Sequence, residues 1–150
     1  MNIMKSFEFC YGHRVWNQVL SGNKECACRR IHGHSGKIDL IITGSELVRG
    51  MLIDFNELAV IKEFVDRTVD HRFLIDADDP LLESLMRLDV SGSLRDELFD
   101  SLVVLPFVPT SENLALWVLK ECEKMLDGFT KIRLKSIRWW ESQKSYAEAS

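Results

Sequence analysis

Three histidines are the residues of this sequence whose type and spacing most directly suggest metal chemistry. The chain has only four histidines, and two of them, His32 and His34, flank a single glycine. On an extended chain, residues two positions apart point to the same side, so both imidazoles would face one site. With His13 on a neighbouring strand, three nitrogens could hold a tetrahedral zinc ion and leave one position open for substrate. The alternative is a plain turn at 32–34 and a hydrogen-bonded core histidine at 13, because an isolated HxH is a weak signal.

A cysteine four positions before His32 could supply a base beside that metal. Cys28 is followed by two arginines, and nearby cations favour the thiolate that a general base needs. Two other interpretations stay open. Cys28 is an ordinary loop cysteine, or Cys26 and Cys28 bind a structural zinc with the two histidines of HGH, although this spacing lacks the usual two separated ligand pairs.

Three acidic positions have both a chemical and a structural interpretation. Asp70 and His71 close a predicted helix, where the carboxylate could orient the imidazole for proton transfer, but a histidine there also complements the helix dipole. Glu112 falls in the first turn of another predicted helix, where a glutamate is favourable in any case. Glu141 follows two tryptophans, and it could face solvent or bind a planar guanidine-like edge through two hydrogen bonds.

The elements that must position these residues follow from hydrophobic periodicity. Alternating aromatic residues predict a strand over 3–13, and a second alternating pattern, whose apolar parity His32 and His34 share, predicts a strand reaching residue 42. A polar loop is expected between them, over 17–30. A helix is expected to begin at Asp54 and to run to Asp70, because its apolar residues recur at helical spacing.

The second half of the chain predicts one more helix and two more strands. Short helix-like pieces over 76–104 indicate an excursion from the core, a helix begins at Pro109 and Thr110 and stops near Gly128, and strands follow over 131–141 and 145–148. This order predicts an α+β fold, with a four-stranded antiparallel sheet covered on one face by two helices. We expect a single domain over residues 1–150.

Composition limits the class of partner. With 46% hydrophobic residues and a net charge of −4, the chain has no electrostatic reason to bind nucleic acid or an anionic membrane. We expect a cytoplasmic protein, because there is no signal-peptide pattern and no apolar run near the roughly 18 residues of a membrane span. The four cysteines are then expected as thiols, with Cys10 and Cys122 as buried core residues.

Six segments, taken together, carry a resemblance to a known family. In chain order they are FEFCYGH, CRRIHGHS, LIDFNEL, VDHRFL, PTSENLA and WWES. In this combination the sequence resembles the 6-pyruvoyl-tetrahydropterin synthase and 6-carboxy-tetrahydropterin synthase family along nearly its whole length. The resemblance implies the tunnelling fold, in which three subunits close a barrel and two trimers stack as a homo-hexamer.

The resemblance also implies roles for individual residues and a substrate. The substrate would be 7,8-dihydroneopterin triphosphate, with no nucleic acid or membrane partner. The cofactor would be Zn²⁺, and Cys28 would be the proton-abstracting thiolate, with Asp70 and His71 as the partner acid. The implied zinc ligands are His13, His32 and His34, and the residues implied near the pterin are Thr110, Glu112 and Glu141.

One spacing separates the branches of this family. Cys28 has the CxxxHGH spacing that resembles the queuosine-pathway branch, whose products are 6-carboxy-5,6,7,8-tetrahydropterin, acetaldehyde and triphosphate. Cys26 has the longer spacing of the pyruvoyl-forming branch, so a 6-pyruvoyl-tetrahydropterin synthase is the first alternative. A non-catalytic oligomeric zinc-binding module is the second. We favour the carboxy-forming branch because RRIHGHS directly follows Cys28.

Overall fold

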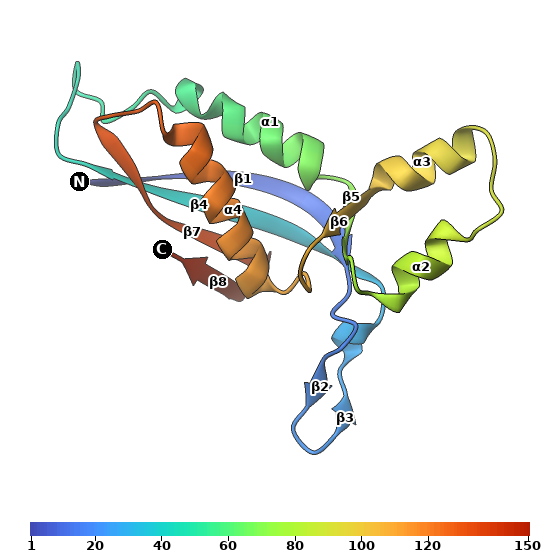
Figure 1. The fold of residues 1–150 in the computed structure, drawn as a ribbon. Coiled ribbons are helices and arrows are strands. Elements are labelled where there is room, and N and C mark those ends of the chain that lie inside the picture. Colours follow the sequence, from blue (N-terminus) through green and yellow to red (C-terminus); the bar gives the residue numbers. More distant parts are fainter.

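A six-stranded mixed sheet organises the protein, which we describe from a computed structural model of residues 1–150 (Figure 1). The strand order across the sheet is β6-β5-β1-β4-β7-β8. Its strands are β1 (Asn2–His13), β4 (His32–Gly44), β5 (Arg72–Asp76), β6 (Leu102–Leu105), β7 (Ile132–Ser142) and β8 (Ser145–Ala149). The four strands β1, β4, β7 and β8 pair antiparallel, as the sequence predicts.

Two helices cover one face of this sheet. They are α1 (Ala59–Thr68), preceded by a 3₁₀ helix η2 (Phe55–Leu58), and α4 (Ser111–Leu126) (Figure 1). Asp54 caps η2 by accepting a hydrogen bond from the N–H of Asn56, at 2.9 Å. The core side chains of both helices are fully buried and include Ile61, Val65, Leu114 and Val118. Burying one such side chain stabilises the fold by roughly 1.5–3 kcal/mol.

The register between β1 and β4 sets which side chains face the helices. Phe9 lies opposite Gly36, and His13 lies opposite His32. Gly36 is required here, since a Cβ at this position would lie only 2.6 Å from Cε2 of Phe9. The absence of a side chain therefore lets an aromatic ring fill the core directly beside the HGH segment.

The predicted four-stranded sheet is too small by two strands. Strands β5 and β6 continue the sheet beyond β1, and both pair in parallel. Their sequences, RFLID and LVVL, are short apolar runs that periodicity alone cannot distinguish from pieces of helix. Both pairings join segments that are distant in the sequence. The chain passes through β4 and α1 between β1 and β5, and through α2 (Pro80–Met86) and α3 (Ser93–Ser101) between β5 and β6.

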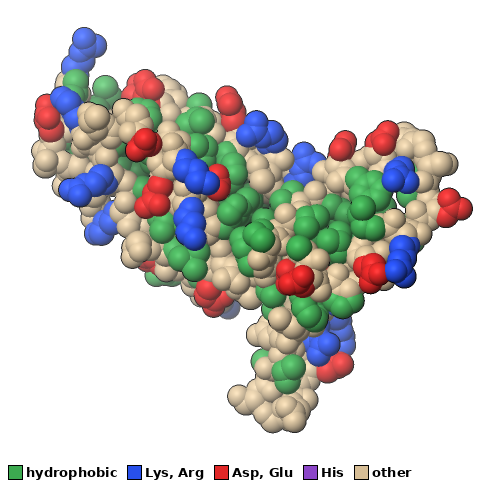
Figure 2. All heavy atoms as spheres, viewed as in Figure 1, with side chains coloured by type: hydrophobic (Ala, Val, Ile, Leu, Met, Phe, Trp, Pro, Cys, Tyr) green, Lys and Arg blue, Asp and Glu red, His purple; other side chains and the backbone are tan.

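The excursion predicted over 76–104 therefore contains two helices and strand β6. Neither α2 nor α3 has a buried residue. Figure 2 shows hydrophobic side chains gathered on the surface over α2, α3 and β6, and the exposed ones there include Met86, Leu94 and Val104. None of the helices is long and apolar enough to cross a membrane.

The expected loop over 17–30 contains a small hairpin and one helical turn. Strands β2 (Val19–Leu20) and β3 (Lys24–Glu25) pair with each other, and the 3₁₀ helix η1 (Ala27–Arg29) follows. In Figure 1 this hairpin projects away from the end of the sheet. A second correction concerns Cys10, which is exposed rather than buried. It alternates with the core residues of β1 and so points to the sheet face that the helices leave open.

Candidate functional site

Three imidazoles meet at the end of the sheet where β1 and β4 pair. The Nε2 atom of His13 lies 3.1 Å from Nε2 of His32 and 3.1 Å from Nε2 of His34. The ligand atoms of all three residues lie within 4.8 Å of one another. The parity of both strands, read from the sequence, is the reason that the rings share one face.

Backbone carbonyls orient two of these rings. Nδ1 of His13 lies 2.7 Å from the carbonyl oxygen of Pro109, and Nδ1 of His32 lies 2.7 Å from the carbonyl oxygen of Arg30. Because a carbonyl oxygen only accepts hydrogen bonds, each Nδ1 carries the proton and donates. Each Nε2 then presents a lone pair to the common point, which is the arrangement found in metal-binding histidines.

The three histidines fit a zinc ion. Zinc–nitrogen distances of about 2.0–2.1 Å in a tetrahedral site put ligand nitrogens roughly 3.3 Å apart, close to the two 3.1 Å separations here. Burial lowers the pKa of His13 to about 4 and also lowers the pKa of His34. Both residues are therefore neutral near pH 7, the form that binds a metal. When bound, zinc would supply Lewis-acid polarisation of a substrate oxygen.

A carboxylate stands beside the three histidines. Oε1 of Glu141, near the end of β7, lies 3.9 Å from Nε2 of His13. Its side chain is 27% exposed, so one edge remains available to a ligand. The residue predicted as a pterin anchor is thus placed next to the candidate metal site by the pairing of β4 with β7.

The N-terminus of α4 also lies beside the three histidines. Thr110 caps the helix, since its side chain accepts a hydrogen bond from the N–H of Asn113 at 3.3 Å. The preceding Pro109 is the residue that holds His13. Glu112 is exposed and makes no hydrogen bond or ion pair within the chain. The structure therefore places Thr110 directly after the residue whose carbonyl oxygen orients His13, whereas the carboxylate of Glu112 is exposed and unpaired within the chain.

Cys28 lies on η1, and its thiol is not activated by the chain alone. The thiol of Cys26, partial burial and the charge of Glu141 together raise the pKa of Cys28. This is opposite to the direction expected from the adjacent arginines. A divalent cation at the three histidines would oppose the effect of Glu141 and favour the thiolate.

Asp70 and His71 form the expected pair, but at a different place on the sheet. Oδ2 of Asp70 lies 3.0 Å from Nδ1 of His71, and its Oδ1 accepts a hydrogen bond from the N–H of Cys10 at 2.9 Å. The N–H of His71 donates to the carbonyl oxygen of Cys10 at 2.7 Å. Partial burial acts to raise the pKa of Asp70, but the hydrogen bonds from Cys10 and His71 outweigh it and lower the pKa.

Within one chain the pair is separate from the metal ligands. The side chain of His71 is 83% exposed, and no hydrogen bond or ion pair joins the pair to the three histidines. His71, His32 and His34 do line the same broad surface cavity. The Asp70–His71 pair therefore lies at the edge of that cavity, with no polar contact to the three histidines.

Two aromatic residues that sequence reasoning did not single out support the imidazoles. The ring of Tyr11 lies 5.2 Å from that of His13 and 5.4 Å from that of His34, centre to centre. The indole N–H of Trp139 donates to Oη of Tyr11 at 3.1 Å. Tyr11 could have been identified from the sequence, because it lies two positions before His13 on the same strand and so shares its face. Trp139 could not, because its position beside Tyr11 depends on how β7 is placed in the sheet.

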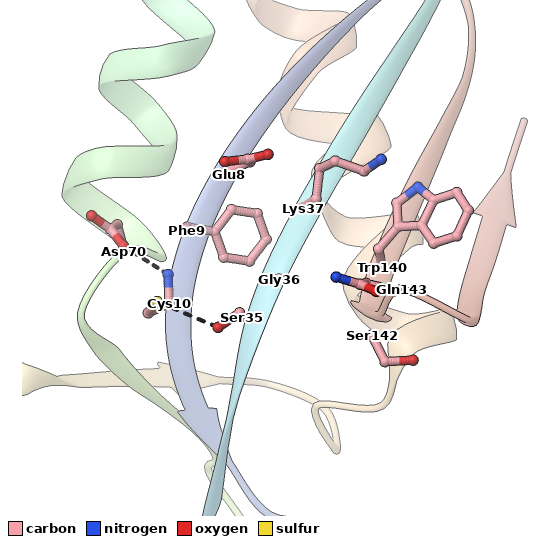
Figure 3. A pocket seen from close by; sticks show the side chains of 10 residues that line it. All are labelled: Glu8, Phe9, Cys10, Ser35, Gly36, Lys37, Asp70, Trp140, Ser142 and Gln143. Carbon is pink, nitrogen blue, oxygen red and sulfur yellow. Dashed lines mark hydrogen bonds between the residues drawn. The ribbon is translucent and has the colours of Figure 1, made fainter.

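A second cavity, of about 670 Å³, lies on the open face of the sheet (Figure 3). Figure 3 shows Asp70 and Cys10 at one side of it and Trp140 at the other. Nζ of Lys37 lies 4.6 Å from the centre of the Trp140 ring. The indole N–H of Trp140 donates a hydrogen bond to Oδ2 of Asp39 at 2.7 Å. Asp70 therefore borders this cavity as well as holding His71.

Comparison with known proteins identifies the family. The family described as 6-pyruvoyl tetrahydropterin synthase matches residues 2–150, and the chain belongs to this family. It is 28% identical to the 6-carboxy-5,6,7,8-tetrahydropterin synthase of Aquifex aeolicus, over 97% of this chain and 95% of that protein.

Solved structures agree with the fold. An uncharacterized protein from Wolinella succinogenes has a TM-score of 0.90 and 36% identity, covering 99% of this chain and 97% of that one. The 6-pyruvoyl tetrahydropterin synthase of Plasmodium vivax has a TM-score of 0.68 at 16% identity, with the same coverage, and shows the fold alone. The expected α+β tunnelling fold is confirmed, with the two additional strands described above.

Proposed function

We propose that this protein is a zinc-dependent 6-carboxy-5,6,7,8-tetrahydropterin synthase, a lyase that converts 7,8-dihydroneopterin triphosphate to 6-carboxy-tetrahydropterin, acetaldehyde and triphosphate. The observation that carries the proposal is the convergence of three Nε2 atoms, with Glu141 3.9 Å from His13. The name of the Aquifex relative supports the carboxy-forming activity. The CxxxHGH spacing of Cys28 supports the same branch.

Each candidate residue has a separate role in the proposed reaction. The carboxylate of Glu141 can accept two hydrogen bonds from the guanidine-like edge of the pterin and so orient the ring beside the three histidines. Cys28, once ionised, would remove a carbon-bound proton from the substrate side chain. Asp70 would keep the His71 imidazole oriented for the second proton transfer, since it holds Nδ1 at 3.0 Å.

A homo-hexamer would bring the separated groups together. The β8 edge of the sheet pairs only with β7, and residues 2–10 of β1 pair only with β4. Such free edges favour pairing with another chain. Closure of a barrel from copies of this sheet would bury the exposed His71 against a neighbouring copy, and we propose that the Asp70–His71 pair serves a site completed by that neighbour.

Two broader expectations belong to the same proposal. The family match over residues 2–150 supports one domain for the whole chain. Four cysteines without a disulfide suit a reducing compartment, which supports the proposed cytoplasmic location.

Product analysis tests the function directly. Purified protein loaded with zinc is incubated with 7,8-dihydroneopterin triphosphate, products are identified by mass spectrometry, and acetaldehyde is assayed in parallel. We expect 6-carboxy-tetrahydropterin together with acetaldehyde. A pyruvoyl product without acetaldehyde would assign the protein to the other branch and shift the role of base to Cys26. A folded, zinc-loaded protein without turnover would leave only the zinc-binding module.

A further inference from the structure

Cys28 is carried by a projecting arm that cannot hold its own position. Residues 17–30 leave the sheet between β1 and β4 and contain no buried side chain. Figure 1 shows this arm extending from the end of the sheet. Because burial of apolar surface is the main stabilising contribution to a fold, the position of the arm depends on contacts at its base.

The base consists of the three residues that follow the metal ligand His13. The N–H of Val15 donates to the carbonyl oxygen of Cys28 at 2.8 Å, and the Val15 side chain is only 7% exposed. This hydrogen bond ties Cys28, four residues before β4 begins, to Val15, two residues after β1 ends. Whatever fixes Arg14, Val15 and Trp16 therefore also fixes the backbone of Cys28.

Trp16 is held by a buried carboxylate at the end of β5. Its indole N–H donates to Oδ2 of Asp76 at 2.9 Å. Asp76 is 5% exposed, and its Oδ1 accepts a hydrogen bond from the N–H of Asp78 at 3.1 Å. Both oxygens of this carboxylate thus have partners, which compensates the cost of burying it.

Arg14 is held by a second buried carboxylate, at the start of α2. Nε of Arg14 lies 3.0 Å from Oδ2 of Asp79, whose side chain is fully buried. Oδ1 of Asp79 caps α2 by accepting a hydrogen bond from the N–H of Leu81 at 2.8 Å. Neither of these two buried atoms makes a hydrogen bond, so the contact is one of charge. A buried carboxylate that lost its cationic partner would carry a large desolvation cost, and the ion pair therefore constrains Arg14.

We propose that Asp76 and Asp79 are positioning residues for Cys28, acting through Trp16 and Arg14. This assigns a role to the excursion, which supplies both carboxylates and so anchors the arm that carries the cysteine. The inference rests on the catalytic role of Cys28 in the proposed function. Asp76 and Asp79 make no hydrogen bond or ion pair with the three histidines or with Glu141, so the metal and pterin-binding groups should be little affected by their loss.

Two substitutions remove the contacts while keeping the local fold. Asp79→Asn keeps a good helix N-cap but removes the charge opposite Arg14, and Trp16→Phe keeps an aromatic side chain but removes the indole donor. The matched controls are Asp54→Asn, at another capping aspartate without an ion pair, and Trp117→Phe, whose indole makes no hydrogen bond. Zinc content and thermal unfolding identify any variant that does not fold.

The readouts are kcat and KM for the zinc-loaded enzyme, and the rate at which iodoacetamide alkylates Cys28, followed by peptide mass spectrometry. We expect both test variants to lose kcat by at least fivefold with KM within twofold, and to alkylate at least threefold faster because the arm is released. The controls should match wild type. Test variants that match wild type in both readouts, or controls that change equally, would overturn the proposal. A wild-type protein without turnover whose variants still alkylate faster would contradict the proposed function but support the anchoring role.

Discussion

Nε2 of His13 and Nε2 of His32 lie 3.1 Å apart, although nineteen positions separate the residues along the chain. The β1–β4 register places them directly opposite each other, and His34 joins them from the same face of β4. With both Nδ1 protons donated to backbone carbonyls, the geometry is already that of a metal site before any ion binds. The strands, rather than the ion, therefore position the ligands.

Replacement of a metal ligand should abolish zinc binding, whereas replacement of His71 should not. His13→Ala or His34→Ala removes one of three nitrogen ligands, so we expect zinc affinity to fall by more than about 100-fold, beyond the effect typical of an outer contact. His71→Ala is the matched control, because it is the fourth histidine and contacts none of the others. Zinc per chain after dialysis against a weak chelator measures the difference. Equal zinc loss in His71→Ala would argue against the three-histidine site.

The two neighbouring cysteines should differ in their effect on turnover. We expect Cys28→Ala to lower kcat by roughly 10²–10⁴-fold, the range for loss of a general base, while zinc stays bound. Cys26→Ala should change kcat by less than about tenfold, and relief of its contact with Cys28 should lower the pKa of that thiol. Steady-state kcat and zinc content, measured for both variants and for wild type, test this expectation. Greater damage from Cys26→Ala would favour the pyruvoyl branch, and loss of zinc from Cys28→Ala would favour a Cys2His2 site.

The metal-free protein should lose stability as the pH falls below about 6.5. His13 has a pKa of about 4 when folded, because it is buried, against 6.5 for a free histidine. Between these values the unfolded chain binds the proton and the folded chain does not, so the free energy of unfolding rises with pH. The stabilisation is complete above 6.5 and falls by up to about 3 kcal/mol towards pH 4.

Urea unfolding of chelator-treated protein at several pH values measures this effect. The control is His13→Gln, which cannot titrate and should show a weaker pH dependence over the same window. His34, whose pKa is also lowered by burial, should contribute in the same direction in both proteins. Parallel curves for wild type and His13→Gln would mean that His13 does not carry the dependence.

Two leucines of α4 offer a matched test of the core beneath the site. Leu114 is fully buried and Leu116 is 48% exposed. We expect Leu114→Ala to lower the free energy of unfolding by about 2–5 kcal/mol, and Leu116→Ala to change it by less than about 0.5 kcal/mol. Denaturant unfolding of the zinc-loaded proteins provides the comparison. A similar cost at both positions would contradict the packing of α4 on the sheet.

Much of the fold and of the metal site was predictable from local pattern. Alternation along 3–13 and 32–42 identified two strands and also the shared face of His13, His32 and His34, because side chains on a strand alternate with a period of two. Thr110 and the stop near Gly128 delimited α4 through capping chemistry. Each of these inferences needs only residues that are close together in sequence.

Contacts between distant segments were decided by the tertiary structure alone. The parallel pairing of β5 and β6 beside β1 and the separation of Asp70 and His71 from the histidines depend on how segments far apart in the chain come to lie side by side. The anchoring of Arg14 and Trp16 by Asp79 and Asp76 is of the same kind. A sequence pattern records which face a residue takes, but only the packed chain determines which residue it meets there.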